Sequence, residues 1–391
     1  VLSFGLLLLL LDGSQSSFLF IYYPFPVFYF FVSKYNVAMY SVAVAIILWI
    51  LQLYVYRAGS SSESPQTHVE TKPAEIIAEK KPDEVSFTEV KSWPNQFEYA
   101  RAFQNASFAL NSTLKGGKII RNPNVKMPSN YVYSSGNYGL IFKLEIDGKY
   151  YALKCFTKGS DLHRKYYEIS KYISRKRPGC LTSFEYIDNA VRTIKEPEKF
   201  YPALKMEWID GDTLYDYIRK NLEDPKALRN IGNQFIKSVY ELQKAGIAHG
   251  DLSNDNILVN GGKIFFVDYD GMYVPAFKGM KASENGHENF QHPGRTFNDY
   301  SEKLDSFSAL VIYTGIYALS IDPGLWKFND DDPDALLFRK KDFIDTKHSP
   351  VFAALSAKKG KTQKLASEIK KALASGPEYS IDLPKLIGLK L

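Results

Sequence analysis

Cysteine is scarce in this sequence of 391 residues, which contains only Cys155 and Cys180. Two cysteines without a pairing pattern exclude a disulfide scaffold and suit a reducing cytosol. Neither sign of charge dominates, because 49 Lys and Arg residues face 43 Asp and Glu residues, a net charge of +6. That balance does not favour a nucleic-acid-binding protein, and no nucleic-acid partner is expected. A hydrophobic content of 45% excludes a wholly disordered chain.

Charge is almost missing from the start of the chain, where Asp12 and Lys34 are the only charged residues before Arg57. Residues 37–56 carry no charge at all. At 1.5 Å per residue, a helix over this range is about 30 Å long, which matches the apolar thickness of a bilayer. We therefore predict a transmembrane helix over 37–56, with a buried core helix as the alternative.

The flanking ranges have different compositions. Residues 1–36 are apolar but contain Pro24 and Pro26, and the chain does not begin with Met. This region is interpreted as a further span or as a truncated piece, so the number of spans stays open. Residues 57–92 are rich in Ser, Pro, Glu and Lys and are predicted to be a flexible linker.

A glycine turn followed by a lysine suggests phosphate chemistry. Gly136 and Gly139 follow a predicted strand, and glycines at such a turn let backbone amides approach a polyphosphate. An ordinary β turn would explain them equally well. After the turn, apolar and polar residues alternate through Asp147-Gly148, which predicts a hairpin. The returning strand carries Lys154, so one ammonium group is expected beside the turn.

Three acidic patterns follow in the second half of the chain. The segment His249–Asn256 (HGDLSNDN) comes after a predicted helix over 228–245. A short apolar strand over 263–267 then leads to Asp268, and Asp305 opens a very apolar helix that reaches Leu319. Each of these acids alone would be read as a solvated turn residue. Taken together with the lysine and the glycine turn, their order is that of a known family.

At these residues the chain resembles the protein kinases over about residues 119–345. More narrowly, it resembles a bacterial group of eukaryotic-like kinases that carry HGDL and VDYDGM motifs. The resemblance implies an α+β fold with two lobes, and we assign residues 93–345 to it. The β-rich N-lobe is expected to reach about residue 208 and the helical C-lobe to begin at about 209. Residues 346–391 are assigned to a basic C-terminal tail.

The resemblance also implies roles for individual residues. Asp251 would be the catalytic base, and Lys154 would hold the phosphates of ATP. Asn256 and Asp268 would bind Mg²⁺ or Mn²⁺, and Asp305 would hold the catalytic loop in place. The expected nucleotide-binding residues are Ser134, Gly136, Gly139, Ala152, Lys154, Met206, Glu207, Ile209 and Leu258.

Lys154 needs an anionic partner, and the predicted helix over 161–173 offers one. Asp161 is expected to cap this helix, and Glu168 is the only acid within its body. Glu168 is therefore our choice for an ion pair with Lys154. The alternative is a surface glutamate that pairs with Lys165 or Lys171.

Some positions depart from the family pattern. Gly250 stands where most protein kinases have arginine, and the activation segment ends in Gln-His-Pro rather than Ala-Pro-Glu. We therefore expect activity without phosphorylation of that segment. Ser253 replaces the Lys or Arg that many protein kinases have two residues after the catalytic Asp. The HGDL motif also occurs in small-molecule kinases of the aminoglycoside-phosphotransferase type. That reading and a nucleotide-binding pseudokinase scaffold remain the alternatives.

Together these patterns predict a membrane-anchored Ser/Thr-type protein kinase whose catalytic domain lies on the cytoplasmic side and acts on an unidentified protein. The C-terminal stretch 356–375 holds six lysines and one glutamate. It is expected either to contact anionic lipid or to form a solvated helix. The spacing of His287, Glu288 and His292 does not favour a metal site.

Overall fold

The structure is a computed structural model in which two compact units are distinguished, Val1–Pro82 and Asp83–Leu391. The residues it describes are 90, 92–124, 131–136, 138–159, 162–329 and 332–390, together with four short strands near the N-terminus.

In the first unit the described residues form two antiparallel strand pairs. These are β1 (Leu6–Leu8) with β4 (Leu19–Ile21) and β2 (Leu11–Asp12) with β3 (Gln15–Ser16). The predicted transmembrane helix over 37–56 and nearly all of the predicted linker lie outside the described residues. Among the helices that the structure does describe, none combines the length and apolar character needed to cross a bilayer.

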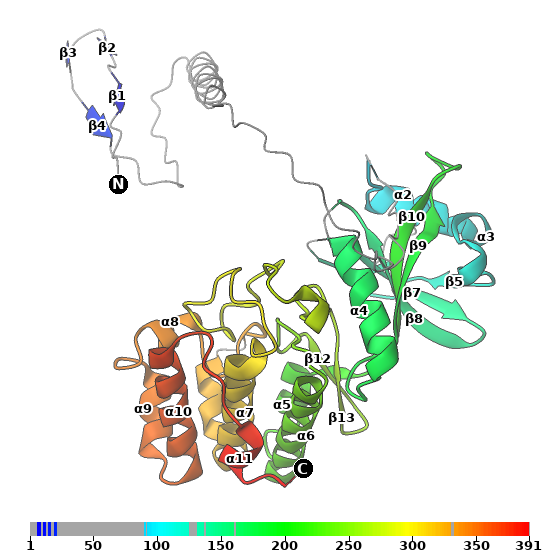
Figure 1. Cartoon of the computed structure of the whole chain (residues 1–391). Coiled ribbons are helices and arrows are strands. Elements are labelled where there is room, and N and C mark those ends of the chain that lie inside the picture. The colour runs from blue at the N-terminus through cyan, green and yellow to red at the C-terminus, as the bar shows by residue number, and fades with distance from the viewer. Residues whose placement is uncertain are drawn as a thin grey trace, which may run out of the picture. The chain divides into compact units, whose positions relative to one another are not determined.

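The second unit begins with a β-rich lobe, drawn in cyan and green in Figure 1. Its antiparallel sheet has the order β5-β7-β8-β10-β9, and β6 pairs with β7. The strands are β5 (Lys118–Ile120), β6 (Val132–Ser135), β7 (Gly139–Ile146), β8 (Lys149–Phe156), β9 (Phe184–Arg192) and β10 (Phe200–Glu207). The predicted hairpin is confirmed, since Asp147 and Gly148 join β7 to β8 with φ of 49° and 74°.

The helix α4 (Leu162–Lys176) lies beside this sheet and packs against β9 (Figure 1). Its buried side chains include Leu162, Tyr166, Ile169 and Ile173, whose spacing places them on one face. Glu168 lies off that face. The expected cap, Asp161, lies outside the described residues. Two short helices, α2 (Gln96–Ala102) and α3 (Ala106–Ala109), precede the sheet.

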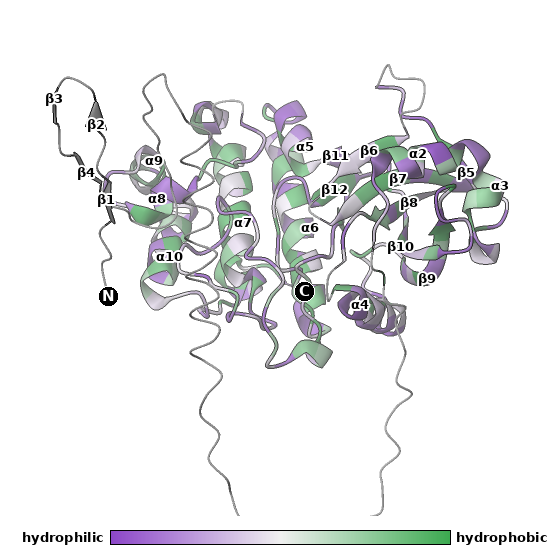
Figure 2. Cartoon of the chain, turned by 90° about the horizontal axis from the view of Figure 1, so that it is seen from above, coloured by the Kyte–Doolittle hydropathy of each residue, from purple (hydrophilic) through white to green (hydrophobic). Residues whose placement is uncertain are grey.

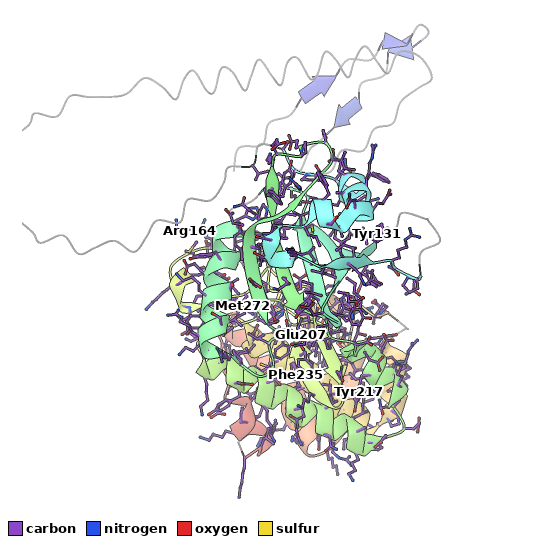
Figure 3. The ribbon with its side chains drawn as sticks, turned by 90° about the vertical axis from the view of Figure 1, so that its right-hand side faces the viewer. Tyr131, Arg164, Glu207, Tyr217, Phe235 and Met272 are labelled. Atoms are coloured by element: carbon purple, nitrogen blue, oxygen red, sulfur yellow. The ribbon has the colours of Figure 1, made fainter. Side chains whose placement is uncertain are left out.

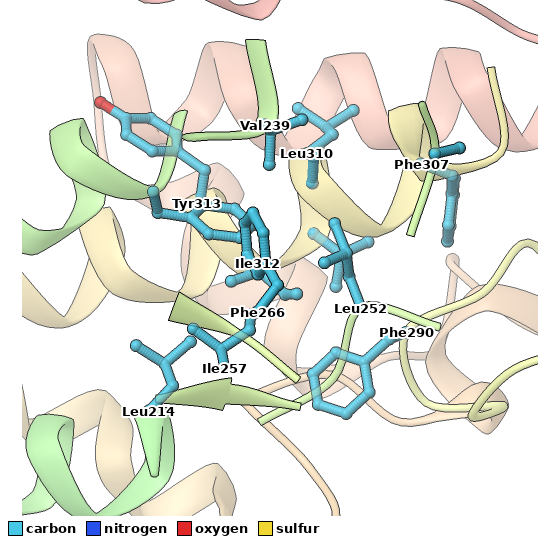
Figure 4. Packing of buried hydrophobic residues seen from close by; sticks show 14 of the residues in the cluster. Leu214, Val239, Leu252, Ile257, Phe266, Phe290, Phe307, Leu310, Ile312 and Tyr313 are labelled. Carbon is cyan, nitrogen blue, oxygen red and sulfur yellow. The ribbon is translucent and has the colours of Figure 1, made fainter. Parts of the chain in front are cut away.

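The helical lobe is built around α7 (Asp305–Ile321), which is buried along nearly its whole length. Figure 2 shows α7 between α6 (Pro225–Lys244) and α10 (Lys361–Ser375), and both helices contact it. In Figure 4, Leu252 of the loop after α6 lies among the apolar side chains beside α7. The apolar core thus holds the segment that carries the HGDL motif. The other elements of this lobe are α5 (Leu214–Lys220), β11 (Asp212–Thr213), β12 (Ile257–Asn260), β13 (Lys263–Phe266) and α8 (Lys340–Ile344).

The helical lobe continues past residue 345, where the sequence analysis began a separate tail. The helices α9 (Pro350–Ala357), α10 and α11 (Leu383–Ile387) follow α8. Their apolar side chains, including Phe352 and Ile369, belong to the main core cluster. These buried positions recur at helical spacing between the lysines, so the basic stretch is one face of packed helices.

Candidate active site

The glycine turn joins β6 to β7, and the amide of Gly136 donates to the carbonyl oxygen of Gly139 at 3.0 Å. A Cβ atom on Gly139 would lie 2.5 Å from the Cys155 carbonyl oxygen. Gly139 is therefore needed for the close approach of β8. Gly136 has open space around it, as expected of backbone that approaches a phosphate, and Ser134 nearby is exposed. The turn can thus be both an ordinary connection between strands and a site where backbone amides approach phosphate.

Lys154 lies on β8 with only 4% of its surface exposed. Its Nζ donates to Asp268 Oδ1 at 3.0 Å and to both carboxylate oxygens of Asp270, at 2.6 and 2.7 Å. Burial lowers the pKa of Lys154, but these two carboxylates outweigh it and raise the pKa above its usual value. The ammonium therefore stays charged.

The expected ion pair between Lys154 and Glu168 is not found. Glu168 is half-buried, and within the described residues its side chain forms no ion pair or hydrogen bond. The physical reason is helix geometry, because the face of α4 that meets the β-sheet and the lysine carries Tyr166 rather than Glu168.

Two residues beside the lysine, Tyr166 and Asp270, were not expected from the sequence. The Tyr166 hydroxyl donates to Asp270 Oδ1 at 2.6 Å, so Asp270 joins α4 to Lys154. Burial, followed by the charge of Asp268, raises the pKa of Asp270 to about 6. The signal was visible, because Asp268-Tyr269-Asp270 places a second carboxylate where the family pattern has glycine.

Asp251 and Asn256 come together in the loop between α6 and β12. Asp251 Oδ1 accepts from the backbone amide of His287 at 2.6 Å, and Oδ2 accepts from Asn256 Nδ2 at 3.1 Å. The loop is fixed from below by Asp305, which is 2% exposed and accepts from the amides of His249 at 2.5 Å and Gly250 at 2.8 Å. The role that the resemblance gave Asp305 matches this contact.

Two oxygen donors are left for a metal ion. The Asn256 amide nitrogen is used by Asp251, which leaves the amide oxygen available, and the Asp268 side chain is 48% exposed. The amide of Val267, the residue before Asp268, donates to the Asn256 carbonyl at 3.0 Å. Asn256 and Asp268 therefore lie on adjacent segments. Asp268 has φ of 62°, a left-handed conformation that is uncommon for a residue with a side chain.

This donor set fits a hard cation that completes its shell with phosphate oxygens, as Mg²⁺ does when bound to ATP. In the described part of the chain, no group of three or more His, Cys, Asp or Glu residues could hold a metal alone. A metal shared with a polyphosphate is consistent with that finding.

The expected adenine-binding residues lie where the two lobes meet, and Figure 3 labels Glu207 there. Met206 is buried at the end of β10, directly opposite Ala152 of β8. The Glu207 amide is already used, since it donates to the Ser183 carbonyl at 3.3 Å. Within the described residues the Ile209 amide makes no hydrogen bond, so it is free to donate to a base. Leu258 is half-buried on β12.

The segment after Gly271 adds two further residues that the sequence did not reveal. Glu284 lies over Gly271, where a Cβ atom would be 2.8 Å from the Glu284 carboxylate. Burial, followed by the charge of Asp251, raises the pKa of Glu284 to about 8. Arg295 Nη1 donates to the Gly250 carbonyl at 2.8 Å and to Gln291 Oε1 at 2.6 Å. The contact of Arg295 with Gly250 joins residues 45 positions apart, so only the fold reveals it.

Comparison with known families agrees with this geometry. Residues 134–337, just over half of the chain, match the protein kinase domain family. The chain therefore belongs to that family.

Three curated relatives match parts of the chain. A segment of 66 residues is 38% identical to the KEOPS complex subunit Bud32 of Pyrococcus abyssi and covers 16% of this chain and 28% of the relative. The serine/threonine-protein kinase GRIK2 of Arabidopsis thaliana is 26% identical over 132 residues, which is 32% of each chain. The cAMP-dependent protein kinase catalytic subunit of Dictyostelium discoideum is 24% identical over 142 residues, 35% of this chain and 21% of the relative. The chain thus spans no more than about a third of the length of these relatives.

Proposed function

We propose that this chain is an ATP-dependent protein kinase of the Ser/Thr type. The observation that carries the proposal is that the fold places three features on adjoining segments. The buried Lys154 bonds the exposed Asp268 carboxylate, Asn256 bonds Asp251, and the amide of Val267, the residue before Asp268, donates to the Asn256 carbonyl. Phosphoryl transfer requires little covalent chemistry from a protein and depends on positioning and charge neutralisation.

Each residue then has a distinct task. Bound Mg²⁺-ATP would supply the phosphoryl group, and the metal ion would neutralise part of the phosphate charge. The Lys154 ammonium would bind and neutralise phosphate oxygens, while Asn256 and Asp268 would hold the metal. Asp251, whose orientation is fixed by Asn256 and by the His287 amide, aligns the acceptor hydroxyl and accepts its proton.

The activation segment supports activity without phosphorylation. Between residues 271 and 293 the only hydroxyl groups belong to Tyr273, which is 4% exposed, and to Ser283. The Ser283 hydroxyl donates to the Asp270 carbonyl at 2.6 Å. Arg295, just after the segment, donates a hydrogen bond to the Gly250 carbonyl of the catalytic loop. Buried or bonded hydroxyls are poor acceptors, and the segment needs no phosphate to hold it in place.

The test is transfer of labelled γ-phosphate by the purified full chain after phosphatase treatment and removal of the phosphatase. Generic proteins and a small aminoglycoside are offered as acceptors in separate reactions. We expect label on serine or threonine of a protein, including the chain itself. Label on the aminoglycoside alone would identify a small-molecule kinase, and loss of all transfer after phosphatase treatment would contradict activity without loop phosphorylation.

Membrane anchoring and membership of the bacterial motif group also belong to this proposal. The anchoring is supported by the charge-free range 37–56, and the catalytic domain is proposed to lie on the cytoplasmic side. Lipid contact by the basic stretch has narrower support, because Lys358 pairs with Asp322 and Lys361 donates to the Tyr313 hydroxyl. Exposed Lys359 and Lys364 remain to meet an anionic surface.

A further inference from the structure

The two carboxylates around Lys154 are not equivalent. Asp270 uses both oxygens, at 2.6 and 2.7 Å, and its side chain is 8% exposed. Asp268 uses one oxygen at 3.0 Å, and its side chain is 48% exposed. A buried ion pair is strong only when its geometry is good and its remaining hydrogen bonds are satisfied. Asp270 meets that requirement, whereas Asp268 keeps its exposed side free.

Asp270 is also held from α4. The Tyr166 hydroxyl donates to Asp270 Oδ1 at 2.6 Å, and the Tyr166 ring lies on Phe156 with 5.3 Å between ring centroids. Tyr166 is 1% exposed. Two residues further on, Glu168 is turned about 200° around the helix, since each residue of an α-helix adds about 100°. A glutamate at that position cannot replace Tyr166 in this contact.

On the basis of the proposed function, we infer that Asp270 is the positioning residue for Lys154 and that Tyr166 makes this positioning depend on the placement of α4. The pair takes over the task that a helix glutamate performs in the family this chain resembles. Asp268 is thereby left to the metal.

This arrangement joins two tasks within one short loop. Asp268 and Asp270 are separated by one residue. The loop that carries the candidate metal ligand Asp268 therefore also carries the residue that orients the Lys154 ammonium. The Ser283 hydroxyl holds the Asp270 backbone at 2.6 Å, which fixes the loop from the activation segment as well. Movement of α4 would break the hydrogen bond of Tyr166 and so remove one of the contacts that orient Asp270 towards Lys154.

The experiment measures the dissociation constant of ATP for the full chain at saturating Mg²⁺ and without acceptor. Asp270→Asn is expected to weaken ATP binding at least about tenfold, because it leaves a buried ammonium without its main partner. Tyr166→Phe removes one hydrogen bond to a charged group and is expected to weaken binding about 3- to 10-fold. Thermal unfolding of each variant verifies that it is folded.

Two comparisons make the test specific. Tyr172→Phe removes another hydroxyl of α4, which donates to the Ala245 carbonyl at 2.7 Å, and is expected to leave ATP affinity within about twofold. Glu168→Gln examines the rival partner. The inference is overturned if Glu168→Gln weakens binding as much as Asp270→Asn, or if Tyr166→Phe and Tyr172→Phe behave alike.

A third result would also overturn it. If Asp270→Asn raises the Mg²⁺ concentration needed for half-maximal binding but leaves ATP affinity at saturating Mg²⁺ unchanged, Asp270 is a metal ligand. Because the readout is binding, a chain that shows the expected pattern but transfers no phosphate would contradict the proposed function and leave this inference standing.

Discussion

The backbone at residue 250 has φ of 83°, a conformation that favours glycine. A Cβ atom there would lie 2.1 Å from the Gly271 carbonyl oxygen, which no side chain permits. This close approach explains why the arginine that usually precedes the catalytic aspartate is missing. Arg295 instead donates to the Gly250 carbonyl oxygen, so an arginine still contacts the catalytic loop, but from a different position in the sequence.

The first prediction concerns this glycine. Gly250→Ala should destabilise the fold by about 2–4 kcal/mol and greatly reduce ATP-dependent activity, because both backbone strain and overlap must be relieved. Chemical denaturation measures the loss. The matched control is Gly279→Ala, which has φ of 81° but nothing within 4 Å of the added Cβ. That variant should lose only about 1 kcal/mol, and equal losses in the two variants would show that overlap with Gly271 does not matter.

At the scale of elements, α4 is connected to the chain that enters the domain. Trp93 stacks on His163 of α4 with 4.9 Å between ring centroids and 6° between ring planes. Neither ring nitrogen of His163 has a hydrogen-bond partner in the part of the chain that is described. Burial lowers the pKa of His163 to about 4, so the ring is neutral at pH 7.

The second prediction is a pH dependence of stability. The unfolded chain takes up a proton at His163 near pH 6.5, whereas the folded chain does so only near pH 4. Stability from this group is therefore complete above pH 6.5 and is lost as the pH falls towards 4, by an amount on the order of 2 kcal/mol. His163→Phe keeps the ring stacking and should flatten the fall in melting temperature between pH 7 and 4.5. An unchanged slope in His163→Phe would contradict this assignment of the pH dependence to His163.

The Asp147-Gly148 hairpin was predictable because its turn chemistry is local. The helix α4 was predictable from its spacing, but which of its polar residues meets Lys154 depends on how the helix packs. Asp270 was hidden for the same reason, since its partners Lys154 and Tyr166 are more than 100 residues away in the chain.

At the scale of the whole molecule, the two lobes and their order were predictable from the motifs, while the end of the helical lobe was not. Composition made residues 346–391 resemble a separate basic tail. The buried side chains of α9 and α10, including Phe352 and Leu365, instead belong to the core around α7. Charge counts cannot separate a free basic segment from the outer face of a packed helix, because both expose their lysines.

The proposed phosphoryl transfer depends on Asp251 as the group that accepts the proton of the acceptor hydroxyl. The most direct measurement is the single-turnover rate of γ-phosphate transfer by the full chain and by Asp251→Asn, with ATP binding measured in parallel. We expect a rate lower by about 10²–10⁴-fold in the variant, the usual contribution of a general base, with ATP affinity nearly unchanged. Equal transfer by both proteins, or no transfer by the native chain despite ATP binding, would contradict it.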